Sequence, residues 1–393
     1  MRGWEAWLER ERHRRAEASL ERALTVSARP TGPLTQRGGR DLINLSSNNY
    51  LGLAQHPSLI EAARVGAARG AGAGASRLIT GHDAVCELAE ARLAELKGTE
   101  RALLFGSGYL ANVGTLAALL DRECTVLSDS LNHASLIDGI RLSGARIVRY
   151  RHADLDHLRS SLQEVSARGS RALVVTDTVF SMDGDAAPLA EIVELKESYG
   201  AALLVDDAHG GGVFGPNGEG YAHEVGVADR VDLTVGTFSK AFGAYGAYVA
   251  ASTQWIEQLV NTARSLIYST GLPPPTVSAI SASIDLVRDA DTRRAALTAK
   301  AERFRKRLET LGLDIGGSTT QIVPIVVGES DHALQFARAL REHGILAVGI
   351  RPPSVPPDTA RVRFSLMATH TDEQLDEALG AIEAVSRAMG LVS

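Results

Sequence analysis

Residues Ala201–Phe242 read AALLVDDAHGGGVFGPNGEGYAHEVGVADRVDLTVGTFSKAF, and this stretch decides the fold. Its first segment, Ala202–Asp206, is apolar without alternation, which is typical of a parallel strand covered by helices on both faces. A second short strand is expected at Val231–Val235. The first strand runs into Asp206-Asp-Ala-His209 and three glycines, and the second runs into Gly236-Thr-Phe-Ser-Lys240. The pattern predicts an α/β fold in which both strand ends carry reactive polar groups.

Open α/β sheets bind ligands at the carboxyl ends of their parallel strands. Side chains alternate along a strand, so Asp206 and Ala208 share a face, and the small Ala208 leaves room for a flat ring. An amine at Lys240, an acid at Asp206 and the hydroxyls of Thr237 and Ser239 form the set that a Schiff-base cofactor enzyme requires. Each feature alone is more often structural, and their combination favours catalysis.

The two motifs together resemble the fold-type I pyridoxal-phosphate (PLP) enzymes, and specifically the α-oxoamine synthases. The resemblance implies that Lys240 holds the cofactor as a Schiff base and that Asp206 pairs with its pyridine nitrogen. It also implies that His209 bonds the phenolic oxygen of the ring and that Thr237 binds the phosphate. The expected architecture is a mainly parallel, seven-stranded sheet between helices, with a smaller C-terminal α+β domain.

The composition indicates an ordinary soluble globular protein. The 393 residues are 45% hydrophobic and 22% charged, and the net charge of −6 disfavours a nucleic-acid or membrane-surface partner. Only Cys86 and Cys124 occur, so no disulfide framework is indicated and a reducing compartment fits. Because no apolar run reaches about 18 residues and the start lacks a signal-peptide core, a cytoplasmic location is expected.

Three segments are expected along the chain: an N-terminal helix and linker at 1–50, a large cofactor-binding domain at 51–275 and a small domain at 276–393. The proline run near residues 273–275 marks the second boundary. The N-terminal helix is predicted from a stripe formed by Trp4, Trp7, Leu8, Leu20 and Leu24. Its arginines indicate a solvated face, although in the family this helix approaches the acyl-substrate channel. Arg22 is therefore a candidate contact for an acidic acyl tail, with the adjacent Glu21 unfavourable to an anion.

Two motifs precede the large domain's first strand. Ser46-Ser-Asn-Asn-Tyr-Leu-Gly52 resembles the family signature S-S-N-D-Y-L-G, so Asn48 would help to hold the carboxylate of the substrate amino acid. A turn that joins a strand to a helix is an equally good interpretation of this segment. The loop at residues 70–81 resembles the family's G-G-S-R loop, with Ala75 replacing a glycine. Ser76 stands where glycine-using 5-aminolevulinate synthases carry Thr, which favours alanine or serine as the substrate.

A strand at Ala102–Phe105, a glycine turn and a helix from Tyr109 predict an anion site at Gly108 and Tyr109 for the cofactor phosphate. The same turn also fits a dinucleotide fingerprint, which would make the protein a nicotinamide dehydrogenase. That match is weak, because it leaves Lys240 unexplained and lies far inside the domain.

Two further motifs carry the resemblance through the middle of the chain. Asn132-His-Ala-Ser-Leu136 resembles S-H-A-S-L, which places His133 over the cofactor ring, where it can guide proton transfers. By itself, a histidine in such a turn is more often a helix cap. Thr178–Asp185 resembles G-V-F-S-M-D-G-D, with Thr178 in place of glycine. There Ser181 would line the cofactor or acyl-thioester pocket, and Asp177 would occupy the acidic position near the ring.

The last motifs concern the subunit interface and the substrate. Leu266–Thr270 resembles a segment that crosses a dimer interface, so Thr270 would reach the phosphate of the partner subunit and the protein would be an obligate homodimer. Arg351-Pro-Pro-Ser-Val-Pro356 resembles R-P-P-[TS]-V-P of the 8-amino-7-oxononanoate synthase branch, with Ser354 a substrate contact. Arg363 matches the arginine that clamps the amino acid's carboxylate, a task suited to a guanidinium fork.

The resemblance therefore implies a PLP-dependent decarboxylative condensation of L-alanine with a pimeloyl thioester of coenzyme A or an acyl carrier protein. Three alternatives stay open on the sequence. One is another α-oxoamine synthase that uses glycine, serine or a different acyl chain. The second is a lyase resembling threonine aldolase, which needs no thioester, and the third is the dehydrogenase, which would lack a Schiff-base chromophore. A non-catalytic subunit is disfavoured by Lys240.

Overall fold

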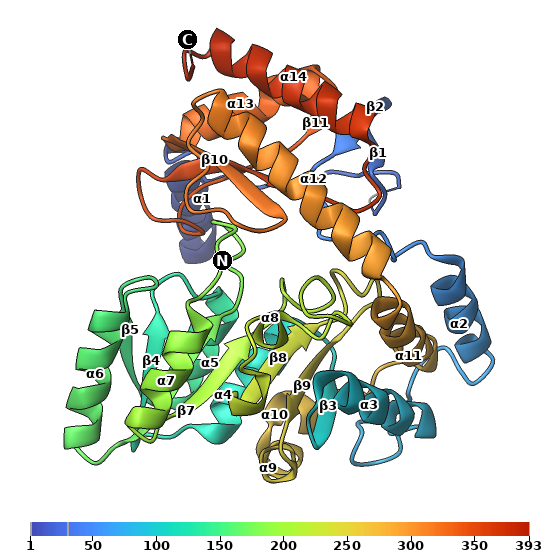
Figure 1. Ribbon diagram of the computed structural model, residues 1–393, viewed down its shortest axis with the longest axis vertical. Coiled ribbons are helices and arrows are strands. Elements are labelled where there is room, and N and C mark those ends of the chain that lie inside the picture. Colours follow the sequence, from blue (N-terminus) through green and yellow to red (C-terminus); the bar gives the residue numbers. More distant parts are fainter. Residues whose placement is uncertain (1, 30, 393) are drawn as a thin grey trace. The chain divides into compact units, whose positions relative to one another are not determined.

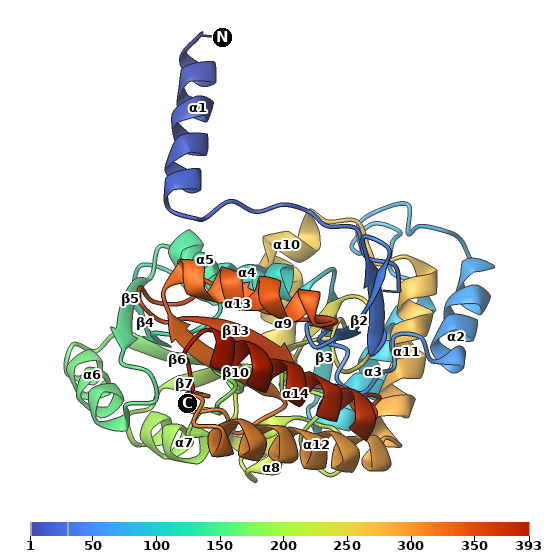
Figure 2. The ribbon, with the colours of Figure 1, turned by 90° about the horizontal axis from the view of Figure 1, so that it is seen from above.

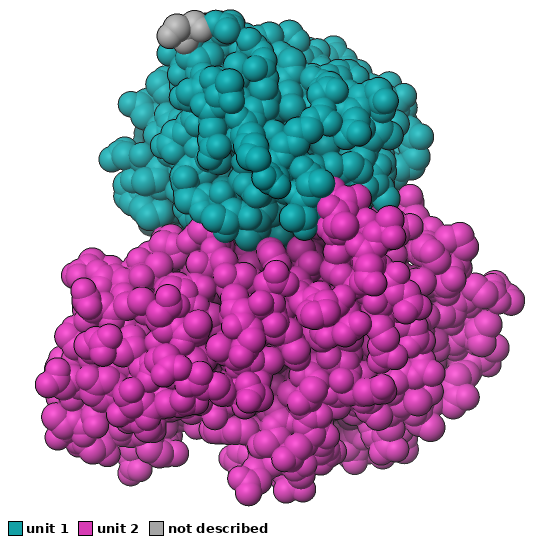
Figure 3. Space-filling model, viewed as in Figure 1, with its two compact units in different colours: residues 1–47, 182–184, 298–393 teal, residues 48–181, 185–297 magenta. Residues whose placement is uncertain are grey.

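The structure is a computed structural model that describes residues 2–29 and 31–392. The chain forms two compact units, which Figure 3 colours separately. Unit 1 comprises residues 1–47, 182–184 and 298–393, and unit 2 comprises residues 48–181 and 185–297. No helix within the described ranges is both long and apolar enough to cross a membrane.

Unit 2 is built on a seven-stranded sheet with the strand order β3-β9-β8-β7-β6-β4-β5 (Figure 1). Its strands are β3 (Arg101–Phe105), β4 (Cys124–Asp129), β5 (Arg146–Tyr150), β6 (Arg171–Asp177), β7 (Ala202–Asp206), β8 (Leu233–Thr237) and β9 (Ala247–Ala251). β9 is antiparallel to both of its neighbours, β3 and β8, whereas β8, β7, β6, β4 and β5 pair in parallel. The expected seven-stranded, mainly parallel sheet is confirmed, and its parallel strands end at one edge.

Helices cover both faces of this sheet. The helices of unit 2 are α2 (Pro57–Ala67), α3 (Ala84–Lys97), α4 (Gly108–Leu119), α5 (Ala134–Ser143), α6 (Leu155–Ala167), α7 (Leu189–Ser198), α8 (Tyr221–Glu224), α9 (Thr253–Thr262), α10 (Arg264–Ile267) and α11 (Pro274–Arg288), with a short 3-10 turn at Ala228–Arg230. One apolar core joins α4, α5 and α9 to the sheet through Leu116, Leu136 and Ile256. A second core joins α6 and α7 to it through Leu162 and Ile192. Burial on both faces explains why the strands lack polar alternation.

Unit 1 contains two three-stranded sheets, ordered β1-β2-β11 and β10-β13-β12. Its elements are α1 (Arg2–Glu17), β1 (Leu34–Arg37), β2 (Arg40–Asn44), β10 (Ile322–Gly328), α13 (Ser330–Glu342), β11 (Ile345–Leu346), β12 (Val348–Ile350), β13 (Ala360–Ser365) and α14 (Asp372–Ala388). The long helix α12 (Asp291–Thr310) crosses the boundary at residue 297. Helix α13 packs against the sheet of β10, β13 and β12, and α14 packs against α13 (Figure 2). The smaller C-terminal α+β domain is thus confirmed.

Three local expectations differ from the structure. The N-terminal helix ends at Glu17, so Leu20 and Leu24 are not part of its stripe, and Ser19 adopts a left-handed φ of 53° just after the helix. The sequence pattern of residues 345–350 predicts a single strand, but the structure has two, because β11 pairs in parallel with β2 whereas β12 pairs antiparallel with β13. The pattern near residues 280–312 predicts helix, and the first helix there begins earlier than expected, at Pro274 within the proline run, since proline is favourable in the first turn.

Candidate active site

The ends of two neighbouring parallel strands bring the main predicted residues together. β7 ends at Asp206 and β8 ends at Thr237, shortly before Lys240. Asp206, His209, Lys240 and His133 line one cavity of about 290 Å³ within unit 2. The same cavity is lined by four predicted cofactor contacts, namely Gly108, Tyr109, Ser181 and Thr237.

The Lys240 amine is the start of a chain of polar contacts. Its Nζ lies 2.8 Å from Nε2 of His209, and Nδ1 of His209 lies 2.6 Å from the hydroxyl of Tyr50. The buried Tyr50 hydroxyl donates in turn to Oδ1 of Asn48 at 3.2 Å. A neutral His209 satisfies these contacts, because its Nδ1–H donates to Tyr50 while its Nε2 accepts from Lys240. This series of polar contacts therefore places a proton acceptor directly beside the amine.

Asp206 is held by neutral hydrogen-bond donors. Its Oδ2 accepts from Nδ2 of Asn112 at 2.6 Å, and its Oδ1 accepts from the Ala208 N–H at 2.9 Å. No cation within residues 2–29 and 31–392 forms an ion pair with this carboxylate. Ala208 lines the cavity beside it, as expected of the small residue on the same face. The negative charge of Asp206 is thus fixed in direction and left available to a ligand in the cavity.

His133 is both the N-cap of α5 and part of the cavity wall. Its Nδ1 accepts from the backbone N–H of Ser135 at 3.3 Å and lies 2.7 Å from the Ser135 hydroxyl. Burial lowers the pKa of His133, and the positive charge of Lys240 adds to this effect while Asp206 opposes it. The imidazole is therefore neutral at physiological pH, and the helix cap considered for it in the sequence is confirmed.

The loop that presents His133 is tied to the sheet by Asn132, the residue that departs from the family's serine. Its amide donates to Val175 O at 2.7 Å, and its Oδ1 accepts from the Asp177 N–H at 2.9 Å. Oδ2 of Asp177 accepts from the His133 N–H at 3.1 Å. Burial raises the pKa of Asp177 well above its usual value, and the charge of Asp206 on the neighbouring strand adds to the effect. Of these two carboxyl groups, Asp177 is the one driven towards the neutral form.

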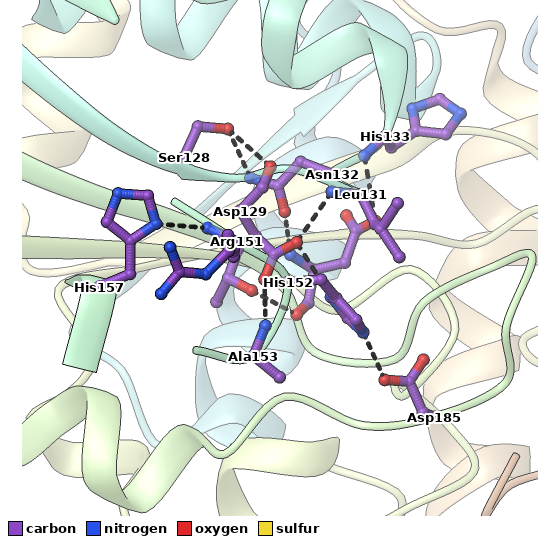
Figure 4. Close-up of polar contacts among 12 residues, drawn as sticks. Ser128, Asp129, Leu131, Asn132, His133, Arg151, His152, Ala153, His157 and Asp185 are labelled. Atoms are coloured by element: carbon purple, nitrogen blue, oxygen red, sulfur yellow. Dashed lines mark hydrogen bonds and ion pairs between the residues drawn. The ribbon is translucent and has the colours of Figure 1, made fainter. Parts of the chain in front are cut away.

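A charged cluster supports the same loop from the side away from the cavity (Figure 4). Nδ1 of His152 lies 3.0 Å from Asp129, and its Nε2 lies 2.8 Å from Asp185. Asp129 also accepts from the N–H groups of Leu131 and Ala153. Burial alone lowers the pKa of His152, but the hydrogen bonds and charges of the two carboxylates outweigh burial and raise it to about 10. His152 is thus a cation that joins the ends of β4 and β5 to the segment before α7.

The N-terminus of α4 forms the expected anion-binding end of the cavity. Ser107 caps the helix by accepting from the Leu110 N–H at 3.3 Å, so its own proton remains free for a ligand. Gly108 and Tyr109 are the first residues of the helix, where backbone N–H groups have no partner within the helix. Ser107 was not predicted, although serine before a glycine-led helix is a recognisable capping signal.

The hydroxyls of Thr237 and Ser239, at and after the end of β8, differ in how far they are engaged with the backbone. Thr237 Oγ1 donates to Gly246 O at 2.8 Å and accepts from the Ser239 N–H at 3.1 Å. In this rotamer its proton is already used. Ser239 also lines the cavity, and its contact with Gly246 O is longer, at 3.4 Å. Ser239 is therefore the more available hydroxyl donor for an anion.

Ser76 and Thr270 lie together, but away from this cavity. The two residues form an antiparallel bridge, and the Gly271 N–H donates to Ala75 O at 2.9 Å. Neither residue is among the cavity's lining residues in the described chain. The sequence predicted Ser76 as a substrate contact and Thr270 as a contact to the phosphate of the partner subunit, and it did not predict their mutual pairing.

Three predicted substrate contacts belong to unit 1. Arg22 and Ser354 line a groove of about 840 Å³ together with Arg338, Arg341 and Arg351. Arg363 is half-buried in β13, in register with Pro324 of β10 and Val348 of β12.

Besides Ser107, three polar residues at or behind the cavity were not predicted as site residues: Tyr50, Asn112 and Ser135. Tyr50 is part of the quoted S-S-N-N-Y-L-G motif, and Ser135 lies within the His133 motif. Asn112 lies one turn after Gly108 on α4, a spacing that places both on one helix face.

The donor set fits the PLP cofactor that the family resemblance implies. One cavity combines an amine, a carboxylate held by neutral donors, a neutral imidazole and a capped helix N-terminus. These are the groups that bind an aldehyde, a protonated ring nitrogen, a ring face and a phosphate.

Comparisons with known proteins agree with this site. The model of the family "Aminotransferase class I and II" matches residues 40–382. A putative 8-amino-7-oxononanoate synthase of Geobacillus kaustophilus is 50% identical over 99% of this chain and 97% of its own length. The 8-amino-7-oxononanoate synthase of Citrifermentans bemidjiense is 48% identical over 96% of this chain and 97% of its own. A serine palmitoyltransferase variant from S. paucimobilis with bound PLP is 32% identical, with a TM-score of 0.90 and 98% of each chain covered. The chain therefore belongs to the class I and II aminotransferase family and, within it, to the α-oxoamine synthases.

Proposed function

We propose that this protein is an 8-amino-7-oxononanoate synthase, a PLP-dependent C-acyltransferase of biotin biosynthesis. It condenses L-alanine with a pimeloyl thioester, releasing the thiol and CO2. The observation that carries the proposal is the placement of Lys240, Asp206, His209 and His133 around one cavity. The names of its relatives at 46–50% identity over nearly the whole chain support this reaction among those of the family.

The cavity residues divide the binding of PLP among them. Lys240 would form the covalent link, Asp206 would pair with the ring nitrogen, His209 would bond the phenolic oxygen and His133 would cover the ring. Gly108, Tyr109 and Thr237 bind the phosphate, with Ser181 completing the wall, and the hydroxyls of Ser107 and Ser239 are further donors. When bound, PLP supplies an electron sink for the carbanion at the α-carbon of the amino acid.

The chain's own residues move the protons. Lys240 removes the proton from the alanine α-carbon and returns one after CO2 has left. The contact of its Nζ with Nε2 of His209 at 2.8 Å supports this role, because it holds the amine in place beside a group that can exchange a proton with it. His133, neutral through burial, orients the reacting groups without adding a positive charge to the site.

The substrate contacts are proposed from the family resemblance. Asn48 and Arg363 hold the carboxylate of alanine, and Ser76 accommodates its methyl group. Arg22 and Ser354 contact the acyl substrate, and their common groove, rich in arginine, supports an anionic ligand there. Either coenzyme A or an acyl carrier protein carries the thioester.

We further propose that the protein acts as a homodimer with shared active sites. Thr270 lies outside its own chain's cavity, as expected of a residue that serves the partner's phosphate site. The neighbouring segments expose the large apolar side chains of Leu78, Ile79 and Tyr268, which a second copy would bury. A cytoplasmic location is proposed from the two cysteines, both of which are free and buried.

The test is thiol release from pimeloyl-CoA by the purified protein with PLP, supplied with alanine, glycine or serine in turn. Release with alanine alone supports the proposal, and release only with glycine or serine contradicts it within the same family. Failure with all three, in protein that binds PLP, favours a carrier-protein thioester, another acyl chain or a lyase. The Lys240→Ala variant is expected to lose turnover, and substantial retained activity would refute the role of Lys240.

A further inference from the structure

The amide of Asn112 connects two groups of the cavity that are far apart in the sequence. Its Nδ2 lies 2.6 Å from Oδ2 of Asp206 and 2.9 Å from Oγ of Ser135. Asn112 projects from α4 and is only 1% exposed. Both N–H groups of the amide are therefore used, one towards the carboxylate and one towards the serine.

The orientation of this amide follows from its surroundings. Rotating it by half a turn would place Oδ1 against the Asp206 carboxylate, where two acceptors repel. In the orientation found, Oδ1 is buried and has no hydrogen-bond partner within the described parts of the chain. Native proteins rarely leave a buried amide oxygen unpaired. The amide therefore donates both of its hydrogen bonds although its own Oδ1 accepts none in the described chain.

Ser135 carries the connection on to His133. Because the Ser135 backbone N–H donates to Nδ1 of His133 at 3.3 Å, that nitrogen is an acceptor. The Ser135 hydroxyl, 2.7 Å from the same Nδ1, then donates its proton there and accepts from Asn112. The hydrogen bonds thus run in one direction from Asn112 to His133 and place the imidazole proton on Nε2.

We propose that Asn112 is a positioning residue that, through Ser135, holds the Asp206 carboxylate and the His133 ring as one hydrogen-bonded unit. Asp206 would pair with the nitrogen of the cofactor ring, and His133 would cover the face of the ring. The hydrogen-bonded unit therefore fixes the positions of these two side chains relative to each other. This inference rests on the proposed function, because it assigns the unit to the binding of PLP.

The test measures PLP binding in addition to catalysis. Asn112→Leu keeps the side-chain volume and removes both donors, whereas Ser135→Ala keeps the hydrogen bond from Asn112 to Asp206 and removes the hydroxyl that links Asn112 to His133. The matched control is Thr115→Val, on the same helix, because Thr115 is fully buried and its hydroxyl has no partner in the described chain. Each variant is analysed by equilibrium dialysis against PLP and by the visible circular dichroism of the bound cofactor.

Asn112→Leu is expected to weaken PLP binding about 10- to 100-fold, the equivalent of one hydrogen bond to a charged group. Ser135→Ala is expected to weaken it less and to change the circular dichroism band. The variant carrying both substitutions should give the Asn112→Leu spectrum, because the connection is already broken. Thr115→Val should bind PLP within about twofold of the wild type.

The outcomes separate this inference from the proposed function. A wild-type protein that does not bind PLP would refute the proposed function. A wild type that binds PLP, with Asn112→Leu inside twofold of it and an unchanged spectrum, would overturn the positioning role alone. If Asn112→Leu does not fold, Asn112→Ser, with one remaining hydroxyl donor, must show an intermediate loss. Unchanged binding in Asn112→Ser would equally contradict the inference.

Discussion

Asp206 and Asp207 are consecutive residues at the end of β7, and their carboxylates have different surroundings. Asp206 lines the cavity and accepts hydrogen bonds from the Asn112 amide and the Ala208 N–H. Asp207 is paired with the ammonium of Lys97 at 3.4 Å, and both side chains are almost completely buried, at 1% and 2% exposure. The Thr178 hydroxyl and the Tyr221 N–H also donate to Asp207.

The difference separates a carboxylate that serves a ligand from one that serves the fold. Asp206 accepts hydrogen bonds from neutral donors, which leaves it available for the contact with the ring nitrogen of PLP that we propose. The Lys97 ammonium compensates the charge of Asp207 internally and also donates to Glu219 O, so the pair ties α3 to the glycine-rich segment after His209. That segment fits closely, since a Cβ at Gly220 would lie 1.8 Å from Oδ2 of Asp207.

We expect the largest effect from a substitution of the ligand-facing carboxylate, Asp206. Asp206→Asn keeps the shape of the side chain and removes its charge, so the ring nitrogen of PLP is no longer held protonated. We expect kcat/KM for thiol release to fall by about 10²–10⁴-fold, while the thermal midpoint of the protein without PLP changes little. A kcat/KM within tenfold of the wild type would show that Asp206 does not have the role proposed for it.

We expect the next largest effect from removing the cation that is paired with Asp207. Lys97→Met leaves Asp207 as a buried charge without its cation, which we expect to lower the free energy of unfolding by about 3–5 kcal/mol. The measurement is the urea midpoint of the protein without PLP, at a protein concentration held constant. Adding Asp207→Asn to Lys97→Met should recover part of the loss, because no uncompensated charge then remains.

The matched control for Lys97 is Lys196→Met. Lys196 is also paired with an aspartate, Asp232, at 3.0 Å, but that carboxylate is 29% exposed. Water can therefore solvate Asp232 once its partner is removed, and the loss should be clearly smaller than at Lys97. Equal losses at the two lysines would contradict the assignment of Lys97–Asp207 as a pair that the fold depends on.

The sequence was sufficient to predict the ligand-facing residues, because these residues lie at the ends of strands. Apolar strands that run into polar residues predict a ligand edge, and Asp206, His209 and Lys240 follow from two such ends of neighbouring strands. His133 and Gly108 follow from local motifs in the same way. The seven-stranded sheet was expected from the family resemblance and not from local pattern, since β9 follows β8 without an intervening helix and β5 carries two arginines.

The supporting residues could not be predicted, because each acts through a contact with a distant part of the chain. Asn112 is separated from Asp206 by 94 positions and Lys97 from Asp207 by 110. A single asparagine or lysine on an amphipathic helix gives no periodic signal to distinguish it from a solvated residue. The strand expected at residues 345–350 failed for a similar reason, since its two halves pair with different sheets.

A third pair of carboxylates, Asp129 and Asp185, extends the comparison, because the cation that compensates them is a histidine and can lose its charge. His152, with a 26% exposed side chain, lies between Asp129 and Asp185, and its pKa is raised to about 10. The folded-state pKa lies above the unfolded value of about 6.5, so the stabilisation is complete below that pH and is lost as the pH rises towards 10. His152→Gln should therefore destabilise the protein more at pH 6 than at pH 10, as measured by urea midpoints. A difference from the wild type that is independent of pH would contradict a charged His152.

The smallest expected effect concerns Thr178, which stands where the family pattern has glycine. Its hydroxyl donates to Oδ1 of Asp207 at 2.7 Å, so the departure adds a donor to the carboxylate on the structural side. Thr178→Val removes that donor while Lys97 and the Tyr221 N–H remain, and we expect a loss of about 1–2 kcal/mol in the free energy of unfolding. Thr178→Gly should lose somewhat more, because glycine also gains freedom in the unfolded chain. PLP affinity should stay within about twofold in both variants, since Asp207 does not line the cavity. A loss of PLP affinity with unchanged stability would show that the surroundings of Asp207 reach the cofactor, and the two aspartates would no longer be separable into ligand and fold.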